Sequence, residues 1–191
     1  MYYSLDTDGL DNVYMEKEVG QNGHINLGMG RMWDVAENAI NLPYRFTMVP
    51  STAVREGAAP SLYGWYPGSH LMQQRLVDVL RGAGVDNLQT FASEVRRQDT
   101  NEAVPGYVVE NIVGRVACAR MKESTKEQLI GHAYVFQNLI IDPKQIGDLL
   151  IFRLHQSPMV VLVHERIARA IEAGNFLGLT LEAVAETTNP A

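Results

Sequence analysis

Residues 75–89 read RLVDVLRGAGVDNLQ, and residues 166–180 read RIARAIEAGNFLGLT. In both, a periodic apolar face is followed by a glycine break and a new apolar run. The aligned pairs share one offset and are Arg75 with Arg166, Leu76 with Ile167, Leu80 with Ile171, Ala83 with Gly174, Val85 with Phe176 and Leu88 with Leu179. Two copies are too few for a solenoid. The repeat therefore predicts one structural unit that occurs twice. In this unit a helix packs on a sheet, the chain turns at a glycine, and a strand follows.

The first helix is expected to begin at Ser69, a residue type that caps helix N-termini, and to stop at the GAG of residues 82–84. Its apolar stripe consists of Met72, Leu76, Val79 and Leu80. The second helix is expected from about His164 to Ala173, with Gly174 ending it.

Short strand-like runs make up most of the remaining chain. MYYSLD followed by the turn-like DTDGLDN predicts a first hairpin, and Gly114 is expected to separate two strands in GYVVENIVGRVACARM. Further strands are expected at residues 44–49, 87–91, 132–142, 148–154, 159–163 and 177–184. The prediction is an α+β protein with a mixed, largely antiparallel sheet and a few packed helices, in a single domain over residues 1–191.

Composition places the chain among ordinary globular proteins, with 46% hydrophobic and 20% charged residues. One cysteine excludes an internal disulfide, the N-terminus lacks a signal-peptide pattern, and no apolar run reaches membrane-helix length. A cytoplasmic protein that does not bind membranes is expected. The net charge of -6, concentrated in residues 1–60 with 4 basic and 8 acidic side chains, argues against nucleic acid as partner. The same negative charge suits a basic protein partner, because complementary charges favour association.

A search for chemistry finds no catalytic, cofactor or metal site. The 5 histidines lack metal-helix spacing, and Cys118 lies in an apolar run where a thiol is usually a small buried hydrophobe. Gly28 and Gly30 lack the third glycine of a dinucleotide fingerprint, and DTDGLD places its glycine too early for a calcium loop.

Two features remain as binding candidates. Tyr63, Trp65 and Tyr66 lie in a loop rich in glycine and proline, and tyrosine and tryptophan often anchor protein interfaces. The alternative is that they form a small local core under the loop. The second candidate is an acidic N-terminal patch, for which the alternative is an ordinary solvated surface. Its residues are Asp6, Asp8 and Asp11.

The order of motifs resembles immunity protein family 11, a domain found beside polymorphic toxins in bacteria. The motifs are the opening YY strand, SHLMQQRLVDVLRGAGVDNLQTF, GYVVENIVGRVACA, IFRL and VLVHERIARAIEAGNFLGLTLEAV. The resemblance implies a non-enzymatic antitoxin that binds and neutralises a cognate toxin by direct contact and so protects the producing cell. It divides the chain into a variable part, residues 1–68, and a family-like core, residues 69–185. The shared motifs are mostly core-forming, so toxin specificity is expected in the variable part.

Two other classes of protein remain open at this point. A small α+β enzyme would place a histidine and a carboxylate in a concave pocket. A ligand-binding or structural subunit would show an apolar cavity or a large apolar patch for self-association.

Overall fold

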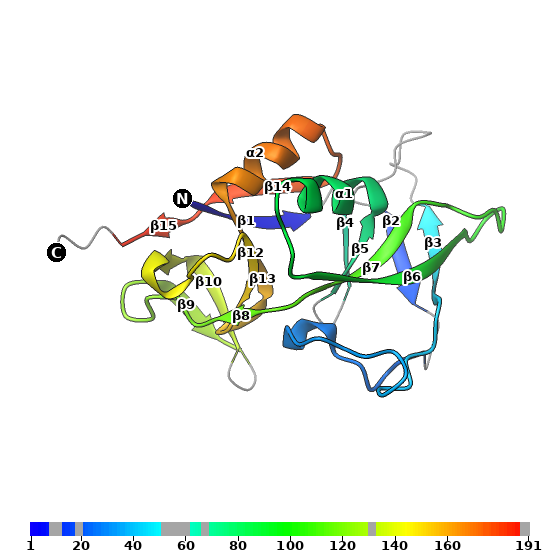
Figure 1. The fold of residues 1–191 in the computed structure, drawn as a ribbon, viewed down its shortest axis with the longest axis horizontal. Coiled ribbons are helices and arrows are strands. Elements are labelled where there is room, and N and C mark those ends of the chain that lie inside the picture. Colours follow the sequence, from blue (N-terminus) through cyan, green and yellow to red (C-terminus); the bar gives the residue numbers. More distant parts are fainter. Residues whose placement is uncertain (8–12, 18–20, 51–61, 66–68, 130–132, 188–191) are drawn as a thin grey trace.

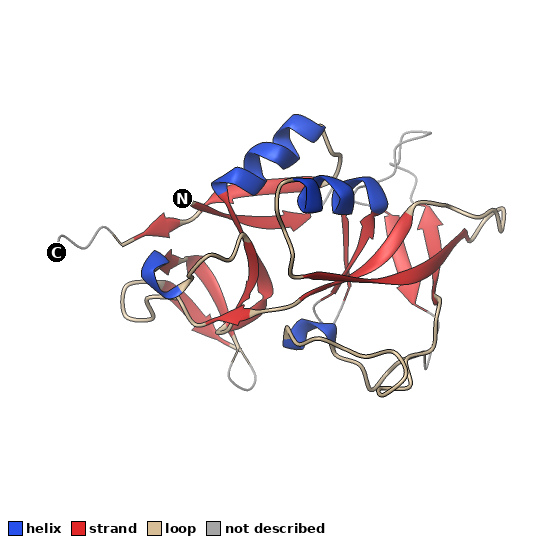
Figure 2. Ribbon diagram, in the orientation of Figure 1, coloured by secondary structure: helices blue, strands red, loops and turns tan. Residues whose placement is uncertain are grey.

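The structure, a computed structural model, describes residues 1–7, 13–17, 21–50, 62–65, 69–129 and 133–187. Most of the strands in these ranges belong to two sheets (Figure 2). The six-stranded sheet has the spatial order β2 (Val13–Lys17), β3 (Tyr44–Pro50), β6 (Leu88–Arg97), β7 (Tyr107–Ile112), β5 (Ser69–Gln73) and β4 (Leu62–Trp65). The five-stranded sheet has the order β14 (Leu179–Ala183), β1 (Tyr2–Thr7), β13 (Ser157–His164), β12 (Ile151–Leu154) and β8 (Arg115–Val116).

Smaller elements complete the architecture. β9 (Thr125–Gln128) pairs with β10 (Tyr134–Asn138), and β11 (Ile140–Ile141) pairs with β15 (Ala185–Glu186). Two 3-10 turns, η1 (Leu27–Met29) and η2 (Pro143–Gln145), lie in the connecting segments. Most strand pairs are antiparallel, whereas β3 with β6, β8 with β12 and β11 with β15 are parallel. The predicted α+β class with a mixed, largely antiparallel sheet is confirmed.

The two helices that the repeat predicts are both present. α1 spans Gln74–Gly82 and α2 spans Glu165–Gly174. Both are preceded by an extended residue at the N-cap, Gln73 and His164. α2 ends at a left-handed residue, Asn175, with φ 49°.

The predicted start of the first helix is wrong by five residues. Ser69 does not cap α1, because residues 69–73 form β5, whose backbone pairs with β4 on one side and with β7 on the other. Met72 shares the helical spacing of Leu76 but reaches the same core from a strand. Two sets of ladder hydrogen bonds hold this segment extended, which local periodicity does not show.

The predicted first hairpin is also wrong. β1 pairs with β13 and β14 in one sheet, whereas β2 pairs with β3 in the other. The turn-like residues 8–12 lie outside the described part of the chain. Adjacent strands in the sequence therefore belong to different sheets, because each finds its partner far along the chain.

The repeat extends well beyond the two helices. We call β4, β5, α1, β6 and β7 the first unit, and β12, β13, α2, β14 and β1 the second unit. Their strand orders correspond, β6-β7-β5-β4 in one sheet and β14-β1-β13-β12 in the other (Figure 1). In the first unit the strand between β6 and β5 is β7, which follows β6 along the chain. In the second unit the strand between β14 and β13 is β1, which comes from the beginning of the chain.

The two units agree in register as well as in order. Val109 of β7 faces Leu71 and Phe91, and Ser4 of β1 faces Leu162 and Glu182. Leu162 and Glu182 are the residues that the sequence repeat aligns with Leu71 and Phe91. The ladders on both sides of each central strand therefore match residue for residue, which makes β1 the structural counterpart of β7.

The two helices pack against each other in opposite directions. Arg75, at the start of α1, donates from Nη2 to the carbonyl of Gly174 at the end of α2, 2.5 Å away, and its guanidinium lies 4.6 Å from the Phe176 ring centroid. The aligned arginine, Arg166, approaches the end of α1: a Cβ at Gly84 would lie 3.3 Å from its Nη2. A cation near the final carbonyls of a helix is favourable. The units are therefore related by an approximate twofold axis that passes between the helices.

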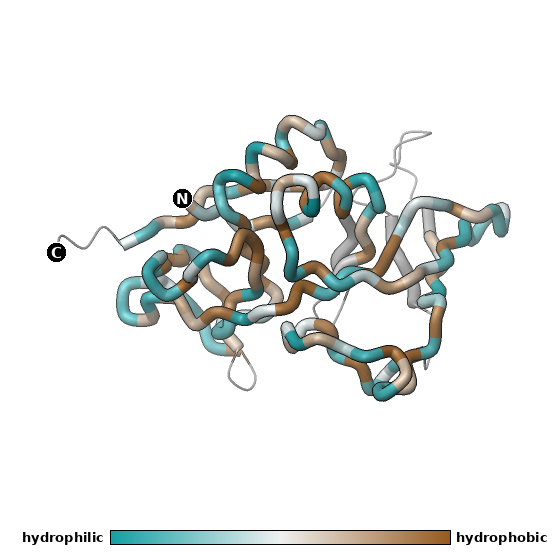
Figure 3. The backbone as a smooth tube through the Cα atoms, in the orientation of Figure 1, coloured by the Kyte–Doolittle hydropathy of each residue, from teal (hydrophilic) through white to brown (hydrophobic). Residues whose placement is uncertain are grey.

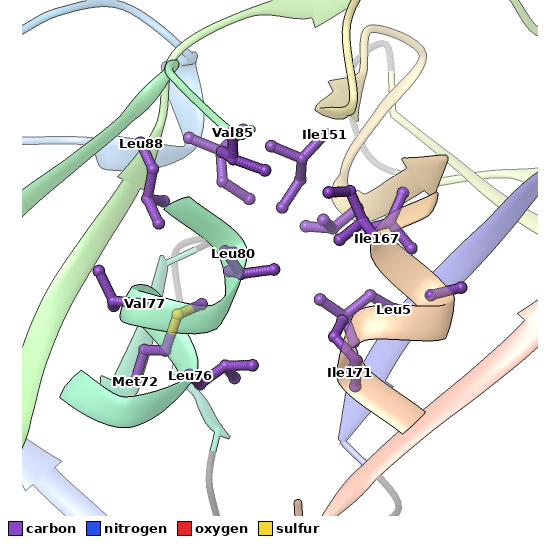
Figure 4. Close-up of a cluster of buried hydrophobic side chains, with 14 residues drawn as sticks. Leu5, Met72, Leu76, Val77, Leu80, Val85, Leu88, Ile151, Ile167 and Ile171 are labelled. Carbon is purple, nitrogen blue, oxygen red and sulfur yellow. The ribbon is translucent and has the colours of Figure 1, made fainter. Parts of the chain in front are cut away.

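One apolar core lies between the helices and the two sheets. Side chains of α1 and α2 point toward one another across it in Figure 4, and along both helices the tube in Figure 3 alternates between hydrophilic and hydrophobic residues. Burying such side chains is worth roughly 1.5–3 kcal/mol each. The buried pairs of this core that the repeat aligns are Met72 with Val163, Leu76 with Ile167, Val77 with Ala168 and Leu80 with Ile171.

Each sheet also has a face turned away from the helices. In the first unit this face is covered by residues 21–44, which bury Ile25, Leu27 and Trp33 against Phe91 and Val109. In the second unit residues 116–129 and 133–149 form the cover. They enclose a core of Tyr2, Cys118, Ile141, Ile146, Phe152, Leu154 and Leu162.

Candidate functional site

A groove of about 410 Å³ opens on the face of the second unit that is turned away from the helices. Its floor comes from β1, β13 and β14, and its wall comes from β10 and the residues after it. The described lining residues are Ser4, Leu5, Asp6, Phe136, Gln137, Asn138, Leu139, Met159, Val160, Val161, Glu182, Ala183, Val184 and Ala185.

Strand alternation produces the polar floor of the groove. Successive side chains of a strand point to opposite faces. Leu5 and Leu181 pack into the core beneath the helices, so their neighbours Ser4, Asp6 and Glu182 occupy the groove face. Ser4 Oγ donates to the Glu182 carbonyl at 3.4 Å, and Asp6 Oδ1 accepts from the Thr7 N–H at 2.7 Å. Both carboxylates belong to exposed residues.

Apolar side chains form the other part of the lining. Met159 is 53% exposed, whereas Phe136, Val160 and Val184 are half-buried at the margin of the core under the groove. Among the described lining residues no side chain carries a positive charge. The groove therefore combines two carboxylates with an accessible apolar strip, a surface that suits a ligand with both cationic and apolar groups.

The structure places one of the predicted binding residues in this groove. Asp6 lines it, whereas Asp8, Asp11 and Tyr66 lie outside the described residues. The predicted loop is wrong for Tyr63 and Trp65: both belong to strand β4, where pairing with Leu71 and Ser69 of β5 holds the backbone extended. β4 in turn contacts β1, the strand that carries Asp6.

The sequence search missed Met159 and Glu182. In LTLEA, residues 179–183, Leu179 and Leu181 alternate with Thr180 and Glu182, and this pattern could have placed Glu182 on an open sheet face. No local signal joins that face to Asp6, because the pairing of β1 with β14 links residues at opposite ends of the chain.

The described candidates for catalysis lie apart from the groove. Cys118 is buried, and burial raises the pKa of its thiol to about 12, which keeps it protonated and unreactive at neutral pH. His24 contacts the Asn38 carbonyl, and His164 accepts from the Arg166 N–H as the cap of α2. In the described ranges no three His, Cys, Asp or Glu side chains are grouped to hold a metal ion.

Residues 12–186 match the model of the Immunity protein family (Imm11). Both parts into which the resemblance divides the chain therefore contribute residues to the match. No curated protein matches the sequence. Of the helices in the described residues, none has the length and apolarity to cross a membrane.

Proposed function

This chain belongs to the Immunity protein family (Imm11), and from that membership we propose that it binds and neutralises a cognate bacterial effector toxin by direct protein–protein contact. The complex protects the cell that produces both proteins, as one half of an effector–immunity pair in a polymorphic toxin system. It forms in the cytoplasm, without a cofactor and without nucleic acid or membrane as partner. The family match over residues 12–186 is the observation that carries this proposal.

The chemistry of the groove supports binding. Its described lining offers two carboxylates and an accessible apolar strip, which suit a ligand with cationic and apolar groups. Inhibition of the toxin then follows from occupancy: the bound immunity protein blocks the toxin's active site or its approach to substrate.

The toxin-contacting residues that we propose are those singled out in the sequence. They are Tyr63, Trp65, Tyr66, Asp6, Asp8 and Asp11. The contact between β4 and β1 supports treating the aromatic and acidic groups as one surface, since Tyr63 and Trp65 belong to β4 and Asp6 to β1. Aromatic anchors surrounded by a polar rim are typical of tight interfaces.

The proposal is tested by purifying the tagged protein from its source bacterium and identifying what co-purifies. We expect one stoichiometric partner with a C-terminal toxin domain, whose toxicity is abolished when the immunity protein is co-expressed. A recovered toxin domain that remains fully toxic beside an excess of the immunity protein would contradict neutralisation.

The aromatic contacts are tested by replacing Trp65 and Tyr66 together with alanine. We expect the affinity for the toxin domain to fall by roughly a hundredfold, since loss of central aromatic anchors costs more than about 2 kcal/mol. Thermal stability should stay nearly unchanged. Leu177→Ala, at an exposed position after α2, is the control and should leave affinity unaltered. An unaltered affinity in the double variant would remove these two residues from the interface.

A further inference from the structure

The first unit shows how a polypeptide segment can lie across the sheet face opposite the helices. Its own residues Arg31–Trp33 cross that face in contact with two amide side chains. Trp33 donates its N–H to Gln89 Oε1 at 3.1 Å, and Gln89 Nε2 donates to the Trp33 carbonyl at 2.6 Å. Asn111 Nδ2 donates to the Arg31 carbonyl at 2.9 Å. The segment is therefore bound through its backbone, with Trp33 buried against the sheet.

The same face of the second unit carries the groove. The matching registers of β7 and β1 align Asn111 with Asp6, and those of β6 and β14 align Gln89 with Thr180 and Phe91 with Glu182. Residues 116–129 and 133–149 cover the part of this face above β12, β13 and the start of β1, where Phe152, Leu162 and Tyr2 are buried. The part formed by Ser4, Asp6 and Glu182 lines the open groove.

The aligned side chains differ in a way that selects the ligand. Asn111 donates a hydrogen bond to a backbone carbonyl, whereas its counterpart Asp6 is a carboxylate that only accepts when ionised. Glu182 likewise replaces the apolar Phe91. Among the described residues neither carboxylate is paired with a basic side chain. A segment in this groove would satisfy both carboxylates of the floor with cationic donors and would place apolar side chains against Phe136 of the wall.

We propose that the groove binds an extended segment of the toxin in which lysine or arginine alternates with apolar residues, lying across β1 and β14 as Arg31–Trp33 lies across β7 and β6. That the partner is a toxin rests on the proposed function. The basic and apolar character of the segment is inferred from the side chains that line the groove. Alternation follows because successive side chains of an extended chain point in opposite directions, so that the cationic side chains face the carboxylates of the floor and the apolar side chains face the wall.

The first test uses two synthetic peptides as probes, one alternating arginine or lysine with valine and one alternating glutamate or aspartate with valine. Binding to the full chain is measured by fluorescence anisotropy at about 50 mM salt, where screening is weak. We expect the basic peptide to bind and the acidic one not to bind. Asp6→Asn with Glu182→Gln should weaken binding of the basic peptide by roughly tenfold or more, a loss of about 1.4 kcal/mol.

A matched control removes the same two charges elsewhere. Asp86 and Glu172 are exposed, and they lie after α1 and within α2, on the helix side of the sheets. Asp86→Asn with Glu172→Gln leaves the same net charge as the groove variant and should retain wild-type affinity. Failure of the basic peptide to bind, or an equal loss in both double variants, would overturn the proposed groove ligand.

The second test uses the toxin domain recovered by co-purification, and it separates the two proposals. Met159→Arg places a cation in the groove at a side chain that is 53% exposed, so little stability should be lost. We expect this variant to bind the toxin domain at least roughly tenfold more weakly than wild type. If wild type neutralises the toxin and Met159→Arg does so with equal affinity, the groove is not the binding site and the immunity function stands. If wild type itself does not neutralise it, the immunity function fails.

Discussion

Arg153 and Glu110 form a buried ion pair where the two units meet. Arg153 Nη2 lies 2.7 Å from Glu110 Oε1, both side chains are 0% exposed, and Arg153 Nη1 also donates to the Pro158 carbonyl. Arg153 belongs to β12 and Glu110 to β7. Across the approximate twofold axis the aligned positions are Gly64 and Leu5, so the pair breaks the symmetry of the units.

Breaking this pair should be costly. Arg153→Met leaves the Glu110 carboxylate buried beside an apolar side chain, and we expect the free energy of unfolding to fall by about 3–5 kcal/mol. The double variant Arg153→Met with Glu110→Leu should recover most of that loss, because Leu5 already occupies the aligned position in the core. Urea denaturation of the wild type, the single and the double variant measures both effects. A double variant no more stable than the single would contradict the view that the loss comes from the unpaired Glu110 carboxylate.

Buried acidic protons make stability fall at high pH. Burial raises the pKa of the Cys118 thiol from 9.0 to about 12, and burial, opposed by a hydrogen bond with Asn22, raises the pKa of Tyr44 from 10.0 to about 12. The native state holds these protons more tightly than the unfolded state. Their contribution to stability is therefore complete below about pH 9 and is lost as the pH rises toward 12.

We expect Cys118→Ala to lose less stability than the wild type when the pH is raised from about 8 to about 11, because the variant has no thiol to ionise on unfolding. Urea midpoints at several pH values give the comparison. The variant is somewhat less stable at neutral pH, so the informative quantity is the slope with pH. Equal slopes would assign the alkaline loss to other groups.

The helices are the elements in which the repeat is easiest to test. Leu76 and Ile167 occupy aligned positions, and both are 0% exposed in the one core that α1 and α2 share. Each truncation to alanine should cost about 2–5 kcal/mol. Because the core is common, each variant should unfold in a single transition when circular dichroism and tryptophan fluorescence are followed together. Separate transitions would mean that the units are independent domains.

Sequence patterns predicted the helices and most strands but not all of their partners. The glycine breaks and apolar periods of residues 75–89 and 166–180 are local signals, and they correctly placed the end of α1 and both ends of α2 to within about one residue. Residues 69–73 look helical because Met72 and Leu76 are four apart, yet β4 and β7 hold them extended. Strand pairing depends on distant residues, which a local window does not include.

At the scale of the whole molecule, the approximate twofold axis explains why β1 lies in the middle of a sheet. It takes the place that β7 takes in the first unit, although Ser4 and Val109, or Glu182 and Phe91, share no chemistry. The sequence repeat was therefore visible only in the helix-turn-strand portion. The groove could not be predicted for the same reason, since Asp6 and Glu182 meet only through this pairing.

Circular permutation tests this reading of the architecture. The Met1 amine lies 3.6 Å from Glu186 Oε1, so a short glycine-rich linker can join residue 187 to residue 1. Opening the chain between β1 and β2 then gives the order β12, β13, α2, β14 and β1, interrupted only by the two-residue β15, which matches the order β4, β5, α1, β6 and β7 of the first unit. We expect the permuted protein to keep its circular dichroism spectrum and to melt within several degrees of wild type. A permuted chain that fails to fold would contradict the equivalence of β1 and β7.

The central position of β1 also affects the order in which the protein can assemble during translation. Residues 62–112 contain every element of the first unit, so its strands can pair while the ribosome is still synthesising the second. β1 leaves the ribosome long before its neighbours β13 and β14 exist, and closing that loop has the largest entropic cost in the fold. Asp6 and Glu182 come together only at that last step. A nascent chain that has not reached residue 182 therefore lacks the groove. The protein can bind a ligand in the groove only after its final strands have been synthesised.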